Sequence, residues 1–233
     1  MSIMESLKKM IVLTGAGMSA ESGIATFRGS GGLWEGHRVE DVATPSAFRA
    51  NPGLVLDFYN QRRKNVLESE PNRGHVILKE LEDVFDVTII TQNVDDLHER
   101  AGSSHIIHLH GELVKARSTA DPSLISKIEG ADLNLGDKCP KGSQLRPHIV
   151  WFGEGVPLME DAIMEVESAD VIIVVGTSMQ VYPAASLVEF AKPGVSIYLV
   201  DPNPPKVSIE NLQIIAKGAS EGLALMASSI SPR

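Results

Sequence analysis

Short runs of aliphatic residues, with helix-like segments between them, constrain the fold of this chain most. The runs are Met10–Leu13, Val87–Ile90, Ile106–Leu109, Val171–Val175 and Val195–Val200. Runs without polar alternation are typical of strands that are buried on both faces of a parallel sheet. Helical patterns lie between them, for example at Gly74–Val84 and Glu160–Ser168. The alternation predicts an α/β fold with a Rossmann-like, doubly wound parallel sheet.

Small and polar residues follow every run. They are Thr14-Gly15-Ala16-Gly17, Thr91-Gln92-Asn93-Val94-Asp95, His110-Gly111, Gly176-Thr177-Ser178 and Asp201-Pro202-Asn203. Open α/β sheets bind ligands outside the carboxyl ends of their strands. Each segment alone is compatible with an ordinary turn, but the five together predict one shared ligand cleft.

Two segments lack this alternation of strand and helix patterns, and they predict a second, smaller module. The module takes about residues 29–73 and 112–148, and the Rossmann-like domain takes about 1–28, 74–111 and 149–233, within one unit of 1–233. In the first segment, Asn51 is positioned to cap a helix that has Pro52 in its first turn.

Charge and composition exclude several classes of partner. The net charge of −9 argues against nucleic acid, which needs clustered positive charge. No apolar stretch approaches the roughly 20 residues that span a membrane, and Met1–Lys9 lacks a signal-peptide core. The single cysteine, Cys139, excludes an internal disulfide. We expect a soluble cytoplasmic protein, and the oligomeric state is left open.

The glycine turn after the first run predicts a nucleotide site. In Gly15-x-Gly17, backbone N–H groups can approach a pyrophosphate without obstruction by a Cβ atom. The spacing alone is weak, because Ala20 occupies the third glycine position. Ser19, Glu21 and Ser22 then offer polar residues typical of a helix start. The full string Gly-Ala-Gly-x-Ser-x-x-Ser-Gly-Ile-x-x-Phe-Arg, residues 15–28, resembles the cofactor loop of the sirtuins, NAD-dependent protein deacylases.

Two further elements support this resemblance. Taken alone, Gln92–Asp95 is best interpreted as an Asx turn that leads into a helix at Asp96. Together with the glycine loop it resembles the sirtuin Gln-Asn-x-Asp element, which implies that Asn93 and Asp95 hold nicotinamide and its ribose, with Gln92 nearby. His110 stands in the His-Gly context of the catalytic histidine, and imidazole is a suitable base near neutral pH. Strand alternation predicts His108 and His110 on one face.

The resemblance implies the remaining cofactor contacts. Phe27 would shield the nicotinamide pocket and Arg28 would help to order the loop. The other implied contacts to NAD are Gly15, Ala16, Gly17, Ser19, Ala20, Glu21, Thr26, Trp34, Gly176, Thr177, Ser178, Asp201, Asn203 and Ala219. Asp201-Pro202-Asn203 departs from the usual Asn-x-Glu form.

Leu145–Glu154 is the second strong match. In the sirtuins, its Val150-Trp151-Phe152-Gly153 stretch lines the acyl-lysine tunnel and pairs with the substrate backbone. The alternative interpretation is an aromatic core strand.

Tyr59 and Arg62 are the candidate residues for recognising the acyl group. They share a helical stripe with Val55 and Val66, whereas Arg63 and Lys64 should point elsewhere. An arginine on an apolar face needs an anionic or hydrogen-bonding partner, which an internal group can also supply. The Tyr-x-x-Arg spacing resembles class III sirtuins, where the pair grips the carboxylate of malonyl- or succinyl-lysine, and Ala43 matches the small residue that enlarges their acyl pocket.

The resemblance fails at the usual zinc site. Most sirtuins hold zinc with two Cys-x-x-Cys pairs, but Gly111–Arg146 contains only Cys139, with Ser118 and Asp121 near the first pair. Structural zinc needs four ligands, so we predict a zinc-free module. The apolar residues expected to stabilise it by packing are Leu113, Leu124, Ile125, Ile128, Leu133 and Leu135.

As a whole, the resemblance implies an NAD-consuming protein-lysine deacylase. It would act on acyl-lysine proteins or peptides, prefer succinyl and malonyl groups over acetyl, and release nicotinamide and O-acyl-ADP-ribose. Two alternatives stay open: a mono-ADP-ribosyltransferase, and a non-catalytic sensor of NAD or ADP-ribose.

Overall fold

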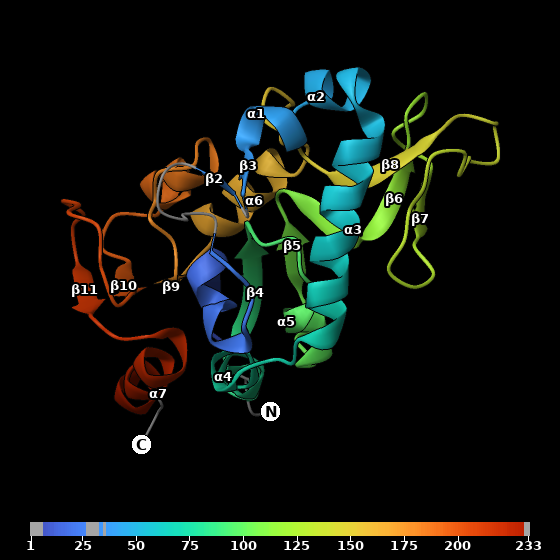
Figure 1. Ribbon diagram of the computed structural model, residues 1–233. Coiled ribbons are helices and arrows are strands. Elements are labelled where there is room, and N and C mark those ends of the chain that lie inside the picture. Colours follow the sequence, from blue (N-terminus) through green and yellow to red (C-terminus); the bar gives the residue numbers. More distant parts are fainter. Residues whose placement is uncertain (1–6, 27–32, 35, 231–233) are drawn as a thin grey trace, which may run out of the picture.

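The computed structural model describes residues 7–26, 33–34 and 36–230 (Figure 1). Its main sheet is parallel, with strand order β11-β10-β9-β1-β4-β5. The strands are β1 (Lys9–Thr14), β4 (Asp86–Thr91), β5 (Ile106–His108), β9 (Val171–Val175), β10 (Ser196–Val200) and β11 (Leu212–Ile215). The predicted α/β, Rossmann-like class is confirmed. The edge strand β11 was not predicted.

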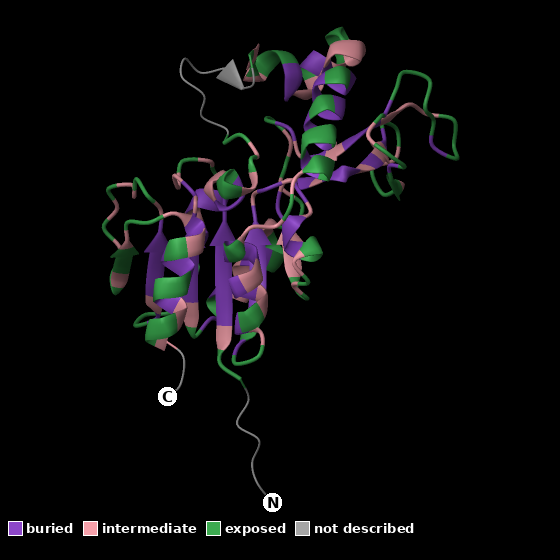
Figure 2. Ribbon diagram, turned by 60° about the horizontal axis from the view of Figure 1, so that its bottom comes forward, coloured by how far each residue is buried: buried purple, intermediate pink, exposed green. Residues whose placement is uncertain are grey.

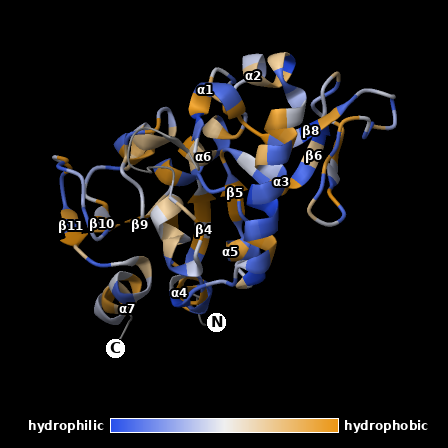
Figure 3. Ribbon diagram, in the orientation of Figure 1, coloured by the Kyte–Doolittle hydropathy of each residue, from blue (hydrophilic) through white to orange (hydrophobic). Residues whose placement is uncertain are grey.

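Helices cover both faces of this sheet, as a doubly wound fold requires. Helices α4 (Arg73–Leu81) and α7 (Ala219–Ile230) pack on one face. Helix α6 (Met159–Glu167) and the 3₁₀ segment η3 (Ala184–Phe190) pack on the other. Figure 2 shows the strands in purple between helices whose outer surfaces are green, and Figure 3 shows the apolar orange along β4 and β5. The continuous aliphatic runs are therefore buried from both sides.

A smaller part lies beside the sheet, around helix α3 (Pro52–Glu68) (Figure 1). Short helices α1 (Val39–Val42) and α2 (Pro45–Ala50) precede it, after the two-stranded β2 (Leu33–Trp34) and β3 (His37–Arg38). An antiparallel sheet of order β7-β6-β8 follows later in the chain, from β6 (Gly111–Ser118), β7 (Ile125–Lys127) and β8 (Leu145–Ile149). The Asn51 side chain accepts a hydrogen bond from the Leu54 backbone N–H (3.1 Å), so the predicted cap is confirmed.

The packing of this smaller part differs from our expectation. Leu113, Ile128 and Leu133 are buried, but Ile125 and Leu135 are exposed. The main correction concerns Arg63, which we expected to point away from the buried face of α3 and which is 0% exposed. Its guanidinium donates to the carbonyl oxygens of Leu113 (2.7 Å) and of Ala131 (2.7 Å).

Those bonds explain how a charge is accommodated there. Arg63 also donates to Asn60 Oδ1 (2.8 Å), and burial lowers its pKa from 12.5 to about 10, so it stays protonated at neutral pH. Asn60 in turn holds both the N–H and the carbonyl of Leu133, at 3.0 and 3.1 Å. Helix α3 therefore binds the segment after β7 through polar groups, where we had expected apolar packing alone.

In the part of the chain that the structure describes, no helix has the length and apolarity needed to cross a bilayer.

Candidate functional site

The turn after β1 lies directly against the turn after β9. Gly15 N donates to Val175 O (3.0 Å), and Gly17 N donates to Gly176 O (2.8 Å). A Cβ atom at Gly17 would lie 2.6 Å from Gly176 Cα, and one at Gly15 would lie 2.8 Å from Gly176 O. Gly176 itself has φ +59. Glycine is required at these positions because the two backbones touch.

The chain then forms two 3₁₀ turns, η1 (Ala16–Met18) and η2 (Ala20–Ser22), where a helix start was expected. Ser19 stands between them with 1% of its surface exposed. Its hydroxyl donates to Asp95 Oδ2 (2.9 Å) and accepts from Asn93 Nδ2 (3.0 Å). Glu21 Oε1 accepts from Ser220 N (3.1 Å), next to buried Ala219 at the start of α7. The cofactor loop is thereby joined to the loop after β4 and to α7.

The loop after β4 forms the Asx turn expected for Gln92–Asp95, and its side chains also contact the cofactor loop. Asp95 Oδ1 accepts from Leu97 N (3.2 Å), the first residue of α5 (Leu97–Arg100), as an Asx turn would. Its other oxygen is the one that Ser19 contacts. Burial raises the pKa of Asp95, although the bonds from Ser19 and Leu97 partly oppose this. Asn93 and Asp95 are both buried, and their polar groups meet at Ser19.

His110 follows β5 in a turn. Its Nδ1 lies 3.0 Å from Gln92 O. A carbonyl only accepts, so Nδ1 carries the proton of the neutral ring and Nε2 keeps a free electron pair. Burial lowers the pKa of His110. The bond to Gln92 O opposes this in part, but burial outweighs it and favours a neutral imidazole that can act as a base.

His108 does not share the environment of His110. Strand β5 ends at His108, so the expected alternation does not reach His110. The ring of His108 is buried and contacts Glu99. The prediction that both histidines occupy one strand face is wrong, because His110 lies in a turn beyond the end of the strand.

The ends of the neighbouring strands complete this edge. Gln92 Nε2 donates to Thr177 Oγ1 (3.3 Å), which joins the ends of β4 and β9. A hollow at the carboxyl edge is lined by Leu13, Ile90, Gln92, Leu109 and Thr177, among others. After β10, Asp201 Oδ1 accepts from Asn203 N (2.8 Å). These contacts bring the ends of β4 and β9 together at one edge of the sheet, and the shared ligand cleft stays a prediction.

Four predicted cofactor residues take no part in the contacts described above. Thr26 is exposed, and Trp34 lies in β2. Phe27 and Arg28 lie outside the described residues.

Two threonines support this edge and were missed from the sequence. Thr14 and Thr91 end adjacent strands in register. Thr91 Oγ1 accepts from Asn93 N (3.0 Å) and from Thr14 Oγ1 (2.8 Å), and His98 Nε2 lies 3.2 Å from the Thr14 hydroxyl. A threonine that closes each of two paired strands is the signal that could have identified them.

A second group of predicted residues meets beside α3. Tyr59 is fully buried, Arg62 is 7% exposed, and Trp151 donates through Nε1 to the Tyr59 hydroxyl (2.9 Å). Burial raises the pKa of Tyr59 and keeps the phenol protonated. The Arg62 guanidinium lies 5.7 Å from the centre of the Phe58 ring. These residues form one buried cluster of aromatic and cationic groups.

The segment after β8 joins this cluster to the edge of the main sheet. Val150 N donates to His110 O (2.9 Å), and Phe152 N donates to Ala43 O (3.0 Å). Ala43 is buried, Phe152 is 46% exposed, and Gly153 has φ +89. The interpretation as an aromatic core strand fits Trp151 alone, since Phe152 and Gly153 face solvent.

An ion-pair network beneath Trp151 was also missed. Arg146 stacks on the indole, 3.3 Å from the ring centre, and pairs with both oxygens of Glu154 at 2.6 and 3.0 Å. Arg117 contacts the same carboxylate at 3.0 Å, and Trp151 N donates to it at 2.8 Å. These contacts lower the pKa of Glu154 in spite of its burial. The sequence signal that could have predicted this network is the pair of charged residues, Arg146 and Glu154, on either side of the apolar segment that contains Trp151.

The region of the expected zinc ligands holds other interactions. The Ser118 side chain accepts from Ala120 N and from Asp121 N, both at 3.2 Å. Lys141 Nζ pairs with Asp121 Oδ2 at 2.8 Å. A hydrogen bond to Ser118 lowers the pKa of the buried Cys139 thiol. One thiol, one hydroxyl and an ion-paired carboxylate are a poor match for four zinc ligands.

Comparison with known proteins identifies relatives over nearly the whole chain. The model of the Sir2 family matches residues 15–183. A Bacteroides thetaiotaomicron protein described as an NAD-dependent protein deacylase is 54% identical over 223 residues, 93% of this chain and 95% of the relative. A Helicobacter pylori protein of the same description is 55% identical over 214 residues, 91% of this chain and 93% of that protein.

Solved structures agree with these relatives. A Sir2 homologue in complex with NAD superposes with a TM-score of 0.85 at 43% identity, covering 97% of this chain and 91% of that chain. A mutant Sir2 homologue bound to ADP-ribose gives a TM-score of 0.87 at 42% identity, covering 97% and 96%. A Sir2 protein bound to a deacetylated peptide and acetyl ADP-ribose gives 0.81 at 29% identity, covering 96% and 94%.

Proposed function

This chain belongs to the Sir2 family of NAD-dependent protein deacylases, and we propose that it prefers lysines carrying malonyl or succinyl groups, with some activity on acetyl-lysine. It releases nicotinamide and O-acyl-ADP-ribose in this proposal. The observation that carries the preference is the buried Arg62, one helical turn from Tyr59 and its partner Trp151. Its substrates are acyl-lysine proteins, and we place the reaction in the cytoplasm.

The glycine turns fit the pyrophosphate of NAD. Gly15, Gly17 and Gly176 let the two turns touch where a Cβ atom would collide, and their own N–H groups donate to main-chain carbonyls of the protein. The pyrophosphate would lie against this close-packed pair of turns. Gln92, Asn93 and Asp95 would hold nicotinamide and its ribose. Thr177, Ser178, Asp201, Asn203 and Ala219 would contact the adenosine half.

His110 is the proposed base. When bound, NAD supplies the ribose carbon that receives the acyl oxygen as nicotinamide leaves. His110 Nε2 then removes a proton from a ribose hydroxyl, which its free electron pair permits while Nδ1 remains bonded to Gln92 O. The buried Asn93 and Asp95 orient the reacting groups and exclude water.

Arg62 and Tyr59 supply the acyl preference. A guanidinium matches the two oxygens of a carboxylate, and burial strengthens such a contact relative to water. The Tyr59 hydroxyl accepts from Trp151 and keeps a proton of its own to donate. Acetyl-lysine has no carboxylate, so it gains nothing from this pair.

The test compares succinyl-, malonyl- and acetyl-lysine peptides of one sequence by nicotinamide release. Arg62→Met should lower kcat/KM for the two acidic acyl groups by about 10- to 100-fold, the worth of one charged hydrogen bond, and change acetyl by less than about threefold. Lys64→Met, on an exposed position of the same helix, is the matched control and should change none of the three.

Equal losses on all three peptides would refute the preference, as would a wild type that favours acetyl. The same samples distinguish the two alternatives. Radiolabel retained on protein from adenine-labelled NAD would indicate mono-ADP-ribosyl transfer. NAD binding without any nicotinamide release would indicate a sensor.

A further inference from the structure

We propose that His108 and Glu99 act together as a positioning pair that holds the main-chain carbonyl of Asn93, and with it the proposed nicotinamide-binding loop. The inference rests on the proposed role of Asn93. It concerns a side chain that the reaction itself does not use.

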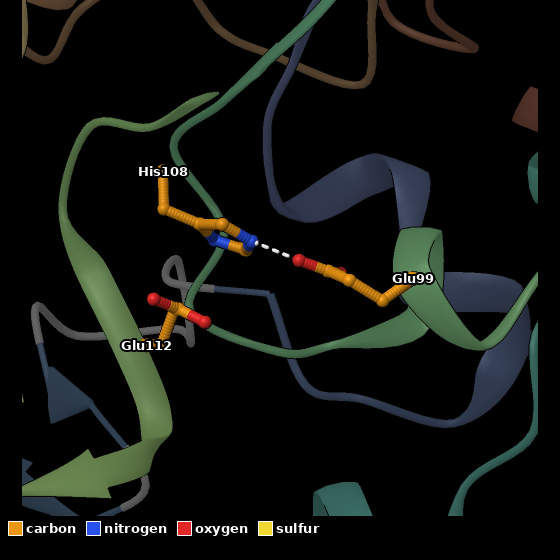
Figure 4. Close-up of side chains that lie close together, drawn as sticks. All are labelled: Glu99, His108 and Glu112. Carbon is orange, nitrogen blue, oxygen red and sulfur yellow. Dashed lines mark hydrogen bonds and ion pairs between the residues drawn. The ribbon is translucent and has the colours of Figure 1, made fainter. Parts of the chain in front are cut away.

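His108 and Glu99 are in direct contact (Figure 4). His108 ends β5 and is 9% exposed. Its Nε2 lies 2.6 Å from Glu99 Oε1, on α5, and its Nδ1 lies 3.3 Å from Asn93 O. The ring thus connects the loop after β4 to the short helix that follows this loop.

Both ring nitrogens must donate in this arrangement. Asn93 O is a carbonyl and only accepts, so Nδ1 carries a proton. A 2.6 Å contact to an ionised carboxylate needs a second proton, on Nε2. Burial opposes this charge, but the hydrogen bond and charge of Glu99, with the charge of Glu112, raise the pKa of His108. The ring is therefore an imidazolium with two fixed donors.

Two histidines consequently hold two successive carbonyls. His110 Nδ1 donates to Gln92 O, and His108 Nδ1 donates to Asn93 O. The Asn93 N–H is fixed separately by Thr91 Oγ1 (3.0 Å). Of these contacts to the loop, the one from His108 needs a doubly protonated ring, because a neutral ring would give its one remaining proton to Nε2, where the Glu99 carboxylate is the stronger acceptor. Nδ1 would then no longer donate to Asn93 O. Loss of the imidazolium charge should let the Asn93 peptide turn while the sheet beneath it stays intact.

A metal ion is the competing occupant of this cluster. Ligand atoms of Glu99, His108 and Glu112 all lie within 4.8 Å of one another. The short contact between His108 Nε2 and Glu99 requires a proton where a metal would need an electron pair. Glu112 Oε2 is also bonded to Lys115 Nζ at 2.6 Å. These contacts favour the ion pair over a cation site.

The test is the pH profile of kcat, measured with saturating NAD and whichever acyl peptide turns over best. The charged and titratable groups that face His108 are Glu99 on α5, Glu112 and Lys115 on β6, Asp95 in the loop, and His98. His110 sets a rising limb, because it must be neutral. Deprotonation of His108 sets a falling limb at higher pH.

Glu99→Gln keeps a hydrogen-bond acceptor but removes the charge. We expect it to move the falling limb by about one to three pH units toward lower pH and to leave the rising limb in place. Glu99→Ala should also lower the kcat plateau by about tenfold, with Gln restoring most of it at low pH. The matched control is Glu82→Gln, which removes the partner of Lys79 (2.7 Å) away from this loop and should move neither limb.

Several outcomes would overturn the proposal. They are a wild type with no falling limb, a Glu99→Gln profile lowered uniformly at all pH values, and a shift of equal size in Glu82→Gln. A loss of wild-type activity on treatment with a chelator, restored by Zn²⁺, would show a cation site instead. Because limb positions and plateaus are compared with one and the same peptide, the result is independent of which acyl group the enzyme prefers.

Discussion

Substituting Gln for His75 should reduce the loss in the free energy of unfolding of this protein as the pH falls. His75 is the third residue of α4, is 0% exposed, and its ring centre lies 4.8 Å from that of His98, which is equally buried. Its Nδ1 accepts from Asn72 N (3.2 Å) as part of a capping box. A second proton would have to bind at this same atom, so protonation breaks the cap and places a charge beside another imidazole.

The magnitude follows from the pKa. Burial lowers the pKa of His75 from 6.5 to about 4, although the charge of Glu21 partly opposes this. The unfolded chain therefore binds the proton first as pH falls. The contribution of a neutral His75 is fully present above pH 6.5 and is lost toward pH 4. At about 1.4 kcal/mol per pH unit, the loss is about 2 kcal/mol at pH 5 and about 3 kcal/mol at pH 4. Burial also lowers the pKa of His98, which adds loss in the same direction.

Urea unfolding followed by circular dichroism at pH 7, 6, 5 and 4.5 measures this effect. Gln is a usual residue at the third position of a capping box, so His75→Gln removes the titration and keeps the cap. The variant should retain about 2 kcal/mol more of its pH 7 stability at pH 5 than the wild type does. His105→Gln removes an exposed imidazole and should follow the wild type. Parallel losses in wild type and His75→Gln would refute the reasoning.

Two further predictions concern the glycine turns and α3. Gly176→Ala should weaken ADP-ribose binding at least tenfold by calorimetry, because φ is +59 and the new methyl group would collide with Met18 N. Gly53→Ala, whose Cβ would lie 3.7 Å from its nearest neighbour, should bind normally, and equal affinities in the two variants would contradict the proposed turn. Arg63→Met should lower the free energy of unfolding by about 3 kcal/mol, since it removes three hydrogen bonds of a charged donor, among them the one to the buried Leu113 carbonyl. A urea midpoint no lower than that of Lys64→Met would exclude this role for Arg63.

The main sheet could be predicted because its central strands are buried on both faces. Each such strand is a continuous aliphatic run, and the residues after it must lie at one edge of a parallel sheet. Strand β11 lacks that signature. It pairs only with β10 and is half-exposed, with Ile214 52% exposed. An edge strand with solvent on one side has no uniform run for a sequence pattern to detect.

The site was predictable where local chain geometry decides it, and less so where distant segments meet. Gly15 and Gly17 follow a strand, and Asn93 and Asp95 follow another, so their convergence is fixed by topology. Arg63 was misjudged because the stripe on α3 describes one face of the helix. Its second buried face is created by Leu113 and Ala131, about 50 and 70 residues later in the chain.

The proposed acyl-binding residues and the proposed NAD-binding turns lie on different structural elements. Ala43, Tyr59 and Arg62 lie within residues 39–68, whereas the glycine turns follow β1 and β9. The segment after β8 bonds through main chain to Ala43 O and to His110 O at the edge of the main sheet, independently of side-chain identity. If the proposed roles hold, acyl specificity can diverge within one short segment while NAD cleavage is retained. For engineering, a library confined to this segment would sample new lysine modifications on an unchanged reaction.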